Sequence, residues 1–189
     1  MSGVLYLASK SPRRRELLGQ LGVAHVVLEV DVPEQREAGE PALDYVRRVA
    51  RDKAEAGWNR VAEQPLARVL AADTEVILDD DVFGKPADAL DAAAMLRRLS
   101  GCAHRAVSAL CLADAQGLTE ALSETVVEFD VLSEDDIRAY IDSGECFGKA
   151  GAYAIQGRAA AFVRRIEGSY SGVMGLPLFE TAQLLGLRR

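Results

Sequence analysis

Residues 4–22, VLYLASKSPRRRELLGQLG, carry the clearest secondary-structure signals of the chain. The short apolar run at 4–8 predicts a buried strand, and Ser11 followed by Pro12 is typical of a helix N-terminus. The leucines that follow predict a helix to about Leu21, ended by the glycine after it. A strand, a loop and a helix in this order favour an α/β fold.

The rest of the chain continues this alternation of strands and helices. Apolar runs and alternating patterns predict strands at 26–30, 68–78, 105–113, 121–130, 152–156 and 161–166, the third and fourth forming an antiparallel pair around Gly117. Helices are predicted at 43–57, 89–99, 133–143 and from about residue 177, and loops at 33–41, 79–81 and 168–175. Without repeats or linkers, residues 1–189 are predicted to form one α/β domain with a mixed sheet.

Composition excludes several classes of protein. With 189 residues and 49% hydrophobic content, the chain is the size of one domain with a real core. The net charge of −7 disfavours nucleic acid and anionic membranes as partners, so a polyanion would need a local basic cluster. Three scattered cysteines are typical of reduced thiols, and the apolar start is too short for a signal peptide. We therefore expect a cytoplasmic protein.

Three consecutive arginines stand at the start of the first helix, where the helix dipole is already positive. On a helical wheel, Arg14 falls on the leucine face and Arg13 on one border, whereas Arg15 lies beyond the other border. A bound anion such as phosphate would stabilise Arg13 and Arg14 beside the free backbone N–H groups. The alternative is that they pair with acids of the protein itself.

Two charged residues interrupt apolar patterns. Lys53 lies in the middle of the apolar stripe of its helix, so it either snorkels to solvent or meets a negative partner, which could be an anion shared with the arginines. Asp73 stands in an apolar strand, and Glu75 lies on the same face of that strand. Two such carboxylates suit a divalent metal or a general base, unless the strand is a sheet edge with a polar face.

Three further polar residues are weaker candidates. Lys85 and Lys149 each follow glycine, where a backbone can approach a ligand closely. Gln156 would present an amide that can read a base edge, although a surface strand glutamine is the commoner case. The histidines His25 and His104 have no partner at ligand spacing, and the P-loop and GxGxxG motifs are absent.

Four ordered blocks, LASKSPRRRELL, AADTEVILDDDVFGKP, KAGAYAIQG and GSYSGVMGLPLFET, resemble the Maf family of nucleoside triphosphate pyrophosphatases. The resemblance extends over nearly the whole chain. It implies one α/β domain with an elongated, curved mixed sheet flanked by helices and a nucleotide-binding cleft of the Maf and ITPase kind. It also implies a cytoplasmic enzyme, a possible homodimer, and a divalent cation, Mg²⁺ or Mn²⁺. The form of the third block, with Gln156, resembles the branch that acts on dTTP and UTP.

The resemblance also implies roles for individual residues. Asp73 matches the proposed general base, and Glu34 matches an acidic position linked to metal or catalysis. The family often has two adjacent acids there, whereas this chain has Pro33 before Glu34. Positions tied to substrate choice are Arg13, Thr74 and Gln156, and positions in the cleft are Ser9, Arg14, Lys53, Lys85 and Lys149.

These roles predict hydrolysis of dTTP and UTP to the monophosphate and pyrophosphate, an attack of water on the α-phosphorus. Such a reaction depends mainly on positioning and charge stabilisation. Arg13, Arg14, Lys53 and Lys85 would hold the triphosphate, and the cation would join Glu34 or Asp73 to phosphate oxygens. The alternative is a regulator of septum formation that binds the nucleotide without turnover.

Overall fold

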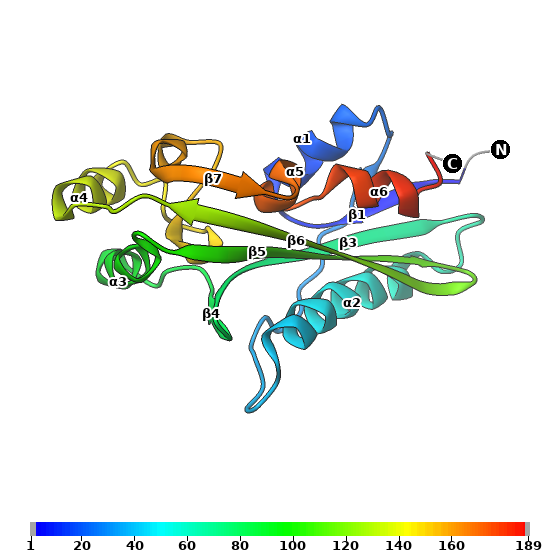
Figure 1. The fold of residues 1–189 in the computed structure, drawn as a ribbon. Coiled ribbons are helices and arrows are strands. Elements are labelled where there is room, and N and C mark those ends of the chain that lie inside the picture. Colours follow the sequence, from blue (N-terminus) through cyan, green and yellow to red (C-terminus); the bar gives the residue numbers. More distant parts are fainter. Residues whose placement is uncertain (1–2, 188–189) are drawn as a thin grey trace. The chain divides into compact units, whose positions relative to one another are not determined.

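The computed structural model of the chain describes residues 3–187. Its strands are β1 (Leu5–Ala8), β2 (Val26–Val27), β3 (Arg68–Leu78), β4 (Asp81–Phe83), β5 (Ala103–Asp114), β6 (Gly117–Phe129) and β7 (Val163–Glu167) (Figure 1). Its helices are α1 (Pro12–Gln20), α2 (Ala42–Val61), α3 (Ala89–Leu99), α4 (Glu134–Asp142), α5 (Tyr170–Met174) and α6 (Leu178–Leu184), with short 3₁₀ helices η1 (Ala150–Ala152) and η2 (Arg158–Phe162).

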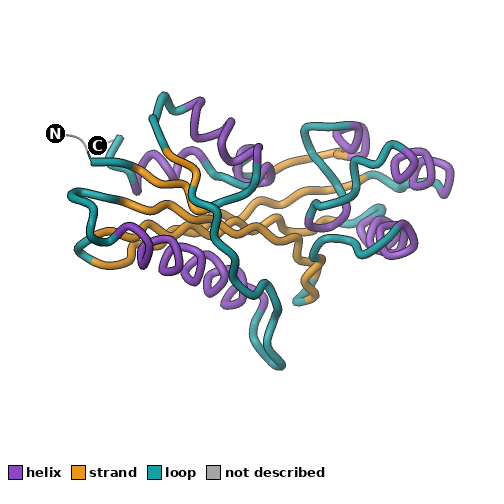
Figure 2. Tube along the Cα trace, turned by 180° about the vertical axis from the view of Figure 1, so that it is seen from behind, coloured by secondary structure: helices purple, strands orange, loops and turns teal. Residues whose placement is uncertain are grey.

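The strands form one mixed sheet. Within residues 3–187, seven strands belong to it, in the order β2-β1-β3-β5-β6-β7, with β4 paired to β3. β1 runs parallel to β2 and to β3, with Ala8 opposite Ala71, whereas the β3–β4 and β6–β7 pairs are antiparallel. This mixed sheet flanked by helices confirms the predicted α/β class (Figure 2).

Contacts within the chain group it into two compact units. The first contains the residues up to Asp73, Ser108–Ser123 and the residues from Gly175 onward, and the second contains Thr74–Val107 and Glu124–Met174. The boundaries fall inside β3, β5 and β6, so each of these strands contributes residues to both units. The single domain expected for residues 1–189 stays a prediction.

Helix α1 begins where the local sequence predicts it. The Oγ of Ser11 accepts a hydrogen bond from the backbone N–H of Arg14 at 3.5 Å, and Pro12 occupies the first helical position. Leu17 and Leu18 are buried. These local signals confirm the predicted strand, loop and helix at the N-terminus.

Helix α2 extends to Val61, beyond the predicted end at Gly57. A Cβ at Gly57 would lie 2.7 Å from Cγ1 of Val69 on β3 and 3.4 Å from the Cβ of Ala8 on β1. Gly57 is therefore a point of close approach between the helix and the sheet, rather than a helix terminator. Figure 1 shows α2 lying along this part of the sheet.

The β3–β4 and β5–β6 hairpins form at the predicted turns, and β4 is a strand that was not predicted. Asp79 and Asp80 form the turn between β3 and β4, and Asp79 has a φ of 57°, which aspartate tolerates. Asp81, predicted as loop, instead begins β4. β5 and β6 are neighbours joined by two residues, so they form the predicted antiparallel pair. The strand predicted at 26–30 is limited to Val26–Val27.

The strand predicted at 152–156 is wrong. The segment forms η1, a turn at 155–157 and η2, and β7 begins only at Val163. Gly151 and Ala152 have φ values of 66° and 57°, which interrupt an extended strand. The backbone N–H of Ala154 donates to the Oη of Tyr140 at 3.0 Å, so it does not belong to a strand ladder. Gln156 is exposed in the turn rather than on a strand face.

The remaining helices agree closely with the sequence. α3 covers the predicted residues 89–99, and α4 begins with the predicted capping box between Ser133 and Asp136. α6 follows Pro177 as expected. Helix α5 was not predicted in the glycine-rich segment, where the backbone N–H of Gly172 donates to the Oγ of Ser169 at 3.0 Å.

Cys102, Cys111 and Cys146 are free thiols, as expected for reduced cysteines. Cys111 is fully buried, and this burial raises the pKa of its thiol to about 12. A thiol that does not ionise near neutral pH is a weak nucleophile. Cys111 therefore serves packing rather than chemistry.

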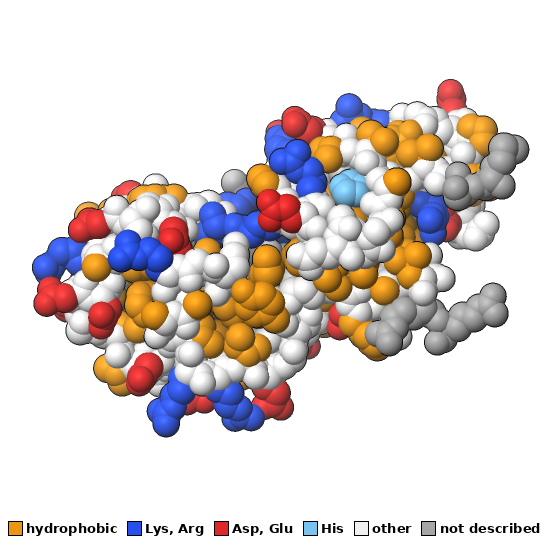
Figure 3. Space-filling model, turned by 90° about the horizontal axis from the view of Figure 1, so that it is seen from above, with side chains coloured by type: hydrophobic (Ala, Val, Ile, Leu, Met, Phe, Trp, Pro, Cys, Tyr) orange, Lys and Arg blue, Asp and Glu red, His pale blue; other side chains and the backbone are white. Residues whose placement is uncertain are grey.

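The exposed surface carries charges of both signs. On the face shown in Figure 3, Lys and Arg side chains lie beside Asp and Glu side chains. Exposed ion pairs in the second unit include those of Arg97 with Glu134 and of Arg98 with Asp81, at 2.7 and 2.8 Å. None of the helices in the described part of the chain is both long enough and apolar enough to span a membrane.

Gly57→Ala should lower the free energy of unfolding by about 1–3 kcal/mol, because the new methyl group would overlap the stiff, buried side chain of Val69. A helical glycine normally gives the opposite result. The control is Gly19→Ala in α1, where nothing lies within 4 Å of the added Cβ, and which should be neutral or stabilising by up to about 1 kcal/mol. Urea denaturation measures both, and an equal gain in the two variants would refute the close approach.

Candidate active site

The first unit contains a lysine shared by two carboxylates. Lys53 on α2 places its Nζ 2.8 Å from Oδ1 of Asp73 on β3 and 2.6 Å from Oε1 of Glu34 in the loop before α2. The side chains of Lys53 and Asp73 are 11% and 7% exposed, and that of Glu34 is 37% exposed. The lysine therefore does not snorkel to solvent but meets two negative partners of the protein.

Asp73 is held in the interior of the sheet. β3 lies between β1 and β5, so the alternative of an edge strand with a polar face is wrong. A buried carboxylate is costly unless it is paired, and Lys53 supplies that pairing at Oδ1. Oδ2 of Asp73 is buried and finds no hydrogen-bond partner among residues 3–187. One oxygen is thus fixed, and the other is a buried acceptor without a partner in the described part of the chain.

The carboxylates of Glu34 and Asp73 are of the type that binds Mg²⁺ together with water and phosphate. Lys53 is shared between the carboxylates of Glu34 and Asp73. Within residues 3–187, no cluster of three or more His, Cys, Asp and Glu side chains could hold a metal ion alone. Mg²⁺ is commonly held by one or two carboxylates together with water and substrate phosphates. Glu34 and Asp73 match that donor set.

The start of α1 forms a second polar group in the first unit. Ser9 is 6% exposed, and its Oγ accepts hydrogen bonds from the backbone N–H of Ser11 at 3.2 Å and from Nη1 of Arg14 at 3.5 Å. The Nε of Arg14 donates to the carbonyl of Gly175 at 2.7 Å. Arg13 is half-buried, and this burial lowers its pKa against the opposing effect of Glu16.

The helical wheel correctly separates Arg15 from Arg13 and Arg14. Arg13 and Arg14 are partly buried, whereas Arg15 is exposed. Ser9 follows Ala8 on β1, and Asp73 lies two residues beyond Ala71, the residue paired with Ala8 on the parallel strand β3. The α1 group and the Lys53 group therefore lie toward the same end of two neighbouring parallel strands, where α/β sheets commonly bind ligands.

The second unit holds the other candidate residues, Thr74, Lys85, Lys149 and Gln156. The backbone N–H of Gly151 donates to the carbonyl of Gly84 at 3.1 Å, which brings the segments of Lys85 and Lys149 side by side. Lys85 is exposed, and Nζ of Lys149 donates to the carbonyl of Phe147 at 3.1 Å. Thr74 is half-buried on β3.

The turn that carries Gln156 is fixed from both sides. Before it, the N–H of Ala154 donates to Tyr140, and after it the N–H of Arg158 donates to Oε2 of Glu145 at 2.8 Å. A Cβ at Gly157 would lie 2.1 Å from the same Oε2, so a larger residue there would displace the Glu145 carboxylate from its hydrogen bond. Gln156 is thus an exposed amide on a well-ordered turn.

The model of the Maf-like protein family matches residues 4–187 of this chain. The chain belongs to the Maf family. It is 56% identical to the dTTP/UTP pyrophosphatase of Bordetella avium, over 96% of this chain and 93% of that protein. It is 54% identical to the dTTP/UTP pyrophosphatase of Cupriavidus metallidurans, over 98% and 96% of the two chains. It is also 54% identical to the nucleoside triphosphate pyrophosphatase of Xylella fastidiosa, over 96% and 97%.

The sequence marks the charged candidate residues of this Maf chain but not the residues that support them. Tyr140 and Glu145 hold the Gln156 turn, and neither stands in a motif that would have marked it. Arg48, which binds the loop of Glu34, was also missed. Its position on α2 one helical turn before Asp52 was the only available signal, because residues at that spacing are neighbours.

A buried histidine in the second unit, His104, contacts Tyr153, which lies three residues before Gln156. His104 is 2% exposed, its ring packs edge-on against Phe129 at 4.9 Å, and its Nε2 shares a hydrogen bond of 3.0 Å with the Oη of Tyr153. Burial lowers the pKa of His104 to about 4 from an ordinary value of 6.5. His104 is therefore neutral in the folded protein near pH 7 and supports Tyr153.

The low pKa of His104 predicts acid sensitivity. The unfolded chain binds a proton near pH 6.5 but the folded chain only near pH 4, so stability should fall as pH decreases between these values. The slope should reach about 1.4 kcal/mol per pH unit. Urea denaturation from pH 7 to pH 4 measures it, with His104→Gln as the control that lacks this titration. Parallel pH profiles of the two proteins would contradict the prediction.

Proposed function

We propose that this protein is a nucleoside triphosphate pyrophosphatase that hydrolyses dTTP and UTP, or modified pyrimidine nucleotides, to the monophosphate and pyrophosphate. The observation that carries the proposal is Asp73, a buried carboxylate of a Maf chain that Lys53 holds at one oxygen and whose other oxygen has no hydrogen-bond partner among the described residues. The names of its near full-length relatives support the same activity and substrates.

Asp73 is the proposed general base. Its Oδ1 is bound to Lys53, which sets the orientation of the carboxylate, so Oδ2 can accept a proton from water. The water oxygen then bonds to the α-phosphorus, and the bond from that phosphorus to the oxygen bridging to the β-phosphate breaks. Pyrophosphate leaves with that oxygen, and the proton of the water stays on Asp73. Glu75, which is also buried, is the second-choice acid.

Cationic side chains are proposed to bind the triphosphate. Arg13, Arg14, Lys53 and Lys85 are proposed to neutralise the phosphate oxygens, and Ser9 and Lys149 are proposed as further substrate-binding residues from the family resemblance. Arg13 and Arg14 stand beside the N-terminus of α1, whose backbone N–H groups favour anions. A Mg²⁺ or Mn²⁺ ion, held by Glu34 or Asp73, would supply further charge stabilisation on the phosphates.

Base selection is assigned to Arg13, Thr74 and Gln156. The amide of Gln156 both donates and accepts hydrogen bonds, so it can pair with the carbonyl and N–H groups of a pyrimidine ring. Its turn is held by Tyr140 and Glu145, which limits the positions that the amide can reach. A cytoplasmic location and a homodimer are proposed from the family resemblance, together with small nucleotides rather than nucleic acid or membrane as partners.

Asp73→Asn should reduce turnover by about 100-fold or more, because the amide cannot take the proton, while nucleotide binding stays nearly unchanged. The assay incubates each protein with UTP and Mg²⁺ and measures pyrophosphate and UMP, with binding followed by calorimetry. The control is Arg15→Ala, which removes an exposed arginine and should stay within about 2-fold of wild type, whereas Arg14→Ala should lose activity.

Two outcomes would contradict the proposal in different ways. Wild-type protein that binds UTP without forming products would support a nucleotide-binding regulator instead of an enzyme. Normal turnover by Asp73→Asn would remove Asp73 as the base but leave the activity intact.

Gln156→Glu should reduce the preference for pyrimidine nucleotides, because a carboxylate accepts hydrogen bonds but cannot donate one to a base carbonyl. We expect the ratio of kcat/KM for UTP to that for GTP to fall by about 10-fold or more, the usual effect of leaving one polar group unpaired. The turnover of UTP, dTTP and GTP under the same conditions measures this ratio. An unchanged ratio would exclude Gln156 from base selection.

A further inference from the structure

Glu34 lies in a segment that has no helix or strand of its own. Residues 28–41, between β2 and α2, are drawn as loop over their whole length in Figure 2. Glu34 is nevertheless placed with its Oε1 2.6 Å from Nζ of Lys53. A loop without ladder hydrogen bonds loses conformational freedom when it is fixed, so other contacts must hold it in this place.

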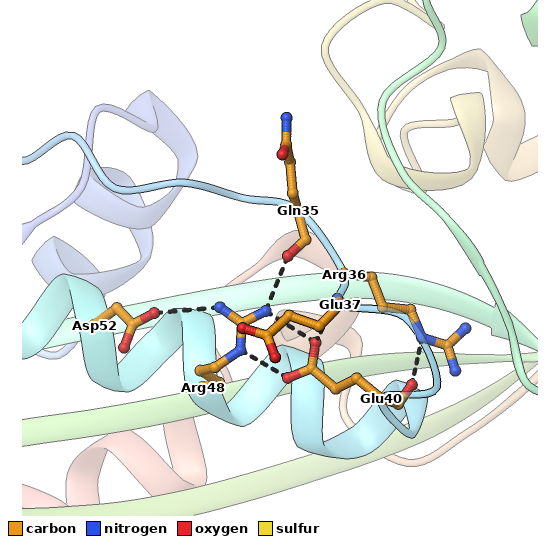
Figure 4. A network of polar contacts seen from close by, with 6 residues as sticks. All are labelled: Gln35, Arg36, Glu37, Glu40, Arg48 and Asp52. Carbon is orange, nitrogen blue, oxygen red and sulfur yellow. Dashed lines mark hydrogen bonds and ion pairs between the residues drawn. The ribbon is translucent and has the colours of Figure 1, made fainter.

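Arg48 on α2 supplies such contacts (Figure 4). Its Nε and Nη2 donate to the two carboxylate oxygens of Glu40 at 2.7 and 2.9 Å. Nη2 also donates to the backbone carbonyl of Gln35 at 2.9 Å, and Nη1 to Oδ2 of Asp52 at 3.4 Å. The planar guanidinium thus binds the loop at two places and its own helix at a third.

Two other residues of the loop, Arg36 and Glu37, also bind Glu40. The Nε of Arg36 donates to the backbone carbonyl of Glu40 at 2.6 Å, and the backbone N–H of Glu37 donates to Oε2 of the Glu40 side chain at 3.0 Å. Glu40 therefore joins the tip of the loop to the same guanidinium that binds Gln35. Removal of the Arg48 side chain would therefore break the contacts of the loop at both Gln35 and Glu40.

The two cations of α2 act on adjacent loop residues. Lys53 binds the side chain of Glu34, and Arg48 binds the backbone of Gln35, the next residue. Arg48 and Lys53 are five residues apart on one rigid helix. The hydrogen bond from Arg48 to Gln35 therefore helps to set the distance from Glu34 to Lys53.

The Arg48–Glu40 pair is stronger than an ordinary surface ion pair. The side chains are only 27% and 12% exposed, and the guanidinium lies 5.7 Å from the centre of the Tyr45 ring. The hydrogen bonds from Arg48 are the main cause that lowers the pKa of Glu40 to about 2. Glu40 thus stays ionised and bound wherever the protein remains folded near neutral pH.

We propose that Arg48 and Glu40 are positioning residues, which hold the 33–41 loop on α2 so that the Glu34 carboxylate stays beside Lys53 and Asp73. The proposal rests on the proposed function only for its effect on turnover. It assigns to Arg48 and Glu40 no contact with the nucleotide, and it makes Glu34 the residue through which they act.

The test combines kinetics with a measurement that needs no turnover. Arg48→Ala and Glu40→Gln should each lower kcat for UTP with Mg²⁺ by about 10-fold, with KM changed by less than about 2-fold, because the phosphate-binding cations are untouched. Hydrogen exchange of the peptides that cover residues 31–41 should be faster in both variants. The matched control is Arg47→Ala, an exposed arginine of the same helix, which should leave kcat and exchange as in wild type.

A double variant distinguishes positioning from a general loss of structure. When Glu34→Gln is already present, adding Arg48→Ala should lower kcat by less than about 2-fold further, since both act through one carboxylate. A full additional 10-fold loss would overturn the proposal, as would wild-type kcat and exchange in both single variants. If Arg48→Ala does not fold, Glu40→Gln, which keeps the side-chain shape, gives the same comparison.

Failure of the proposed function would look different. It would appear as wild-type protein that forms no pyrophosphate from UTP, and the exchange of residues 31–41 would then decide the positioning by itself. Faster exchange in Arg48→Ala and Glu40→Gln but not in Arg47→Ala would support it, and equal exchange in all proteins would overturn it.

Discussion

The buried ion pair between Lys53 and Asp73 is the contact on which the first unit of this Maf protein depends. Removing one partner of a buried pair costs about 3–5 kcal/mol, because the remaining charge is left in a poorly polarisable interior. Helix α2 must therefore lie close to β3 at this point. Gly57 makes that possible, since it stands one helical turn after Lys53 and allows contact with Val69. From Val69 to Asp73 a strand advances about 13 Å, whereas a helix advances only about 6 Å over four residues, and the long lysine side chain covers the difference.

The parts of the fold that could be predicted are those fixed by neighbouring residues. Ser11 and Pro12 start α1 through a cap and a preset φ, and Ser133 with Asp136 starts α4 through reciprocal hydrogen bonds. The candidate site was found in a related way. Lys53 and Asp73 each place a charge where the apolar period requires none, and a chain keeps such a violation mainly where function needs it.

The parts that could not be predicted depend on residues distant in sequence. The alanines of 152–156 have the alternation of a strand, but Tyr140 takes the N–H of Ala154 and Glu145 that of Arg158, and the segment between them forms a turn. Glycine commonly ends a helix, so the sequence predicts the end of α2 at Gly57. Its close approach to Val69 explains why a glycine stands inside the helix instead. The order of the 33–41 loop depends on Arg48, and a loop of mixed charges gives no period from which to infer it.

The Lys53 group combines one lysine with two acids. A second lysine beside Asp73 would compete for its Oδ2, which is buried and has no hydrogen-bond partner among residues 3–187. Two carboxylates suit a cation that arrives with the proposed substrate, while Arg13 and Arg14 at the start of α1 suit its phosphates. A nucleotide that carries a divalent ion meets both requirements at once, whereas a free phosphate group meets only the second. The ordering of Glu34 by Arg48 matters for the same reason, because the Glu34 carboxylate shares Lys53 with Asp73 and lies on a loop without helix or strand.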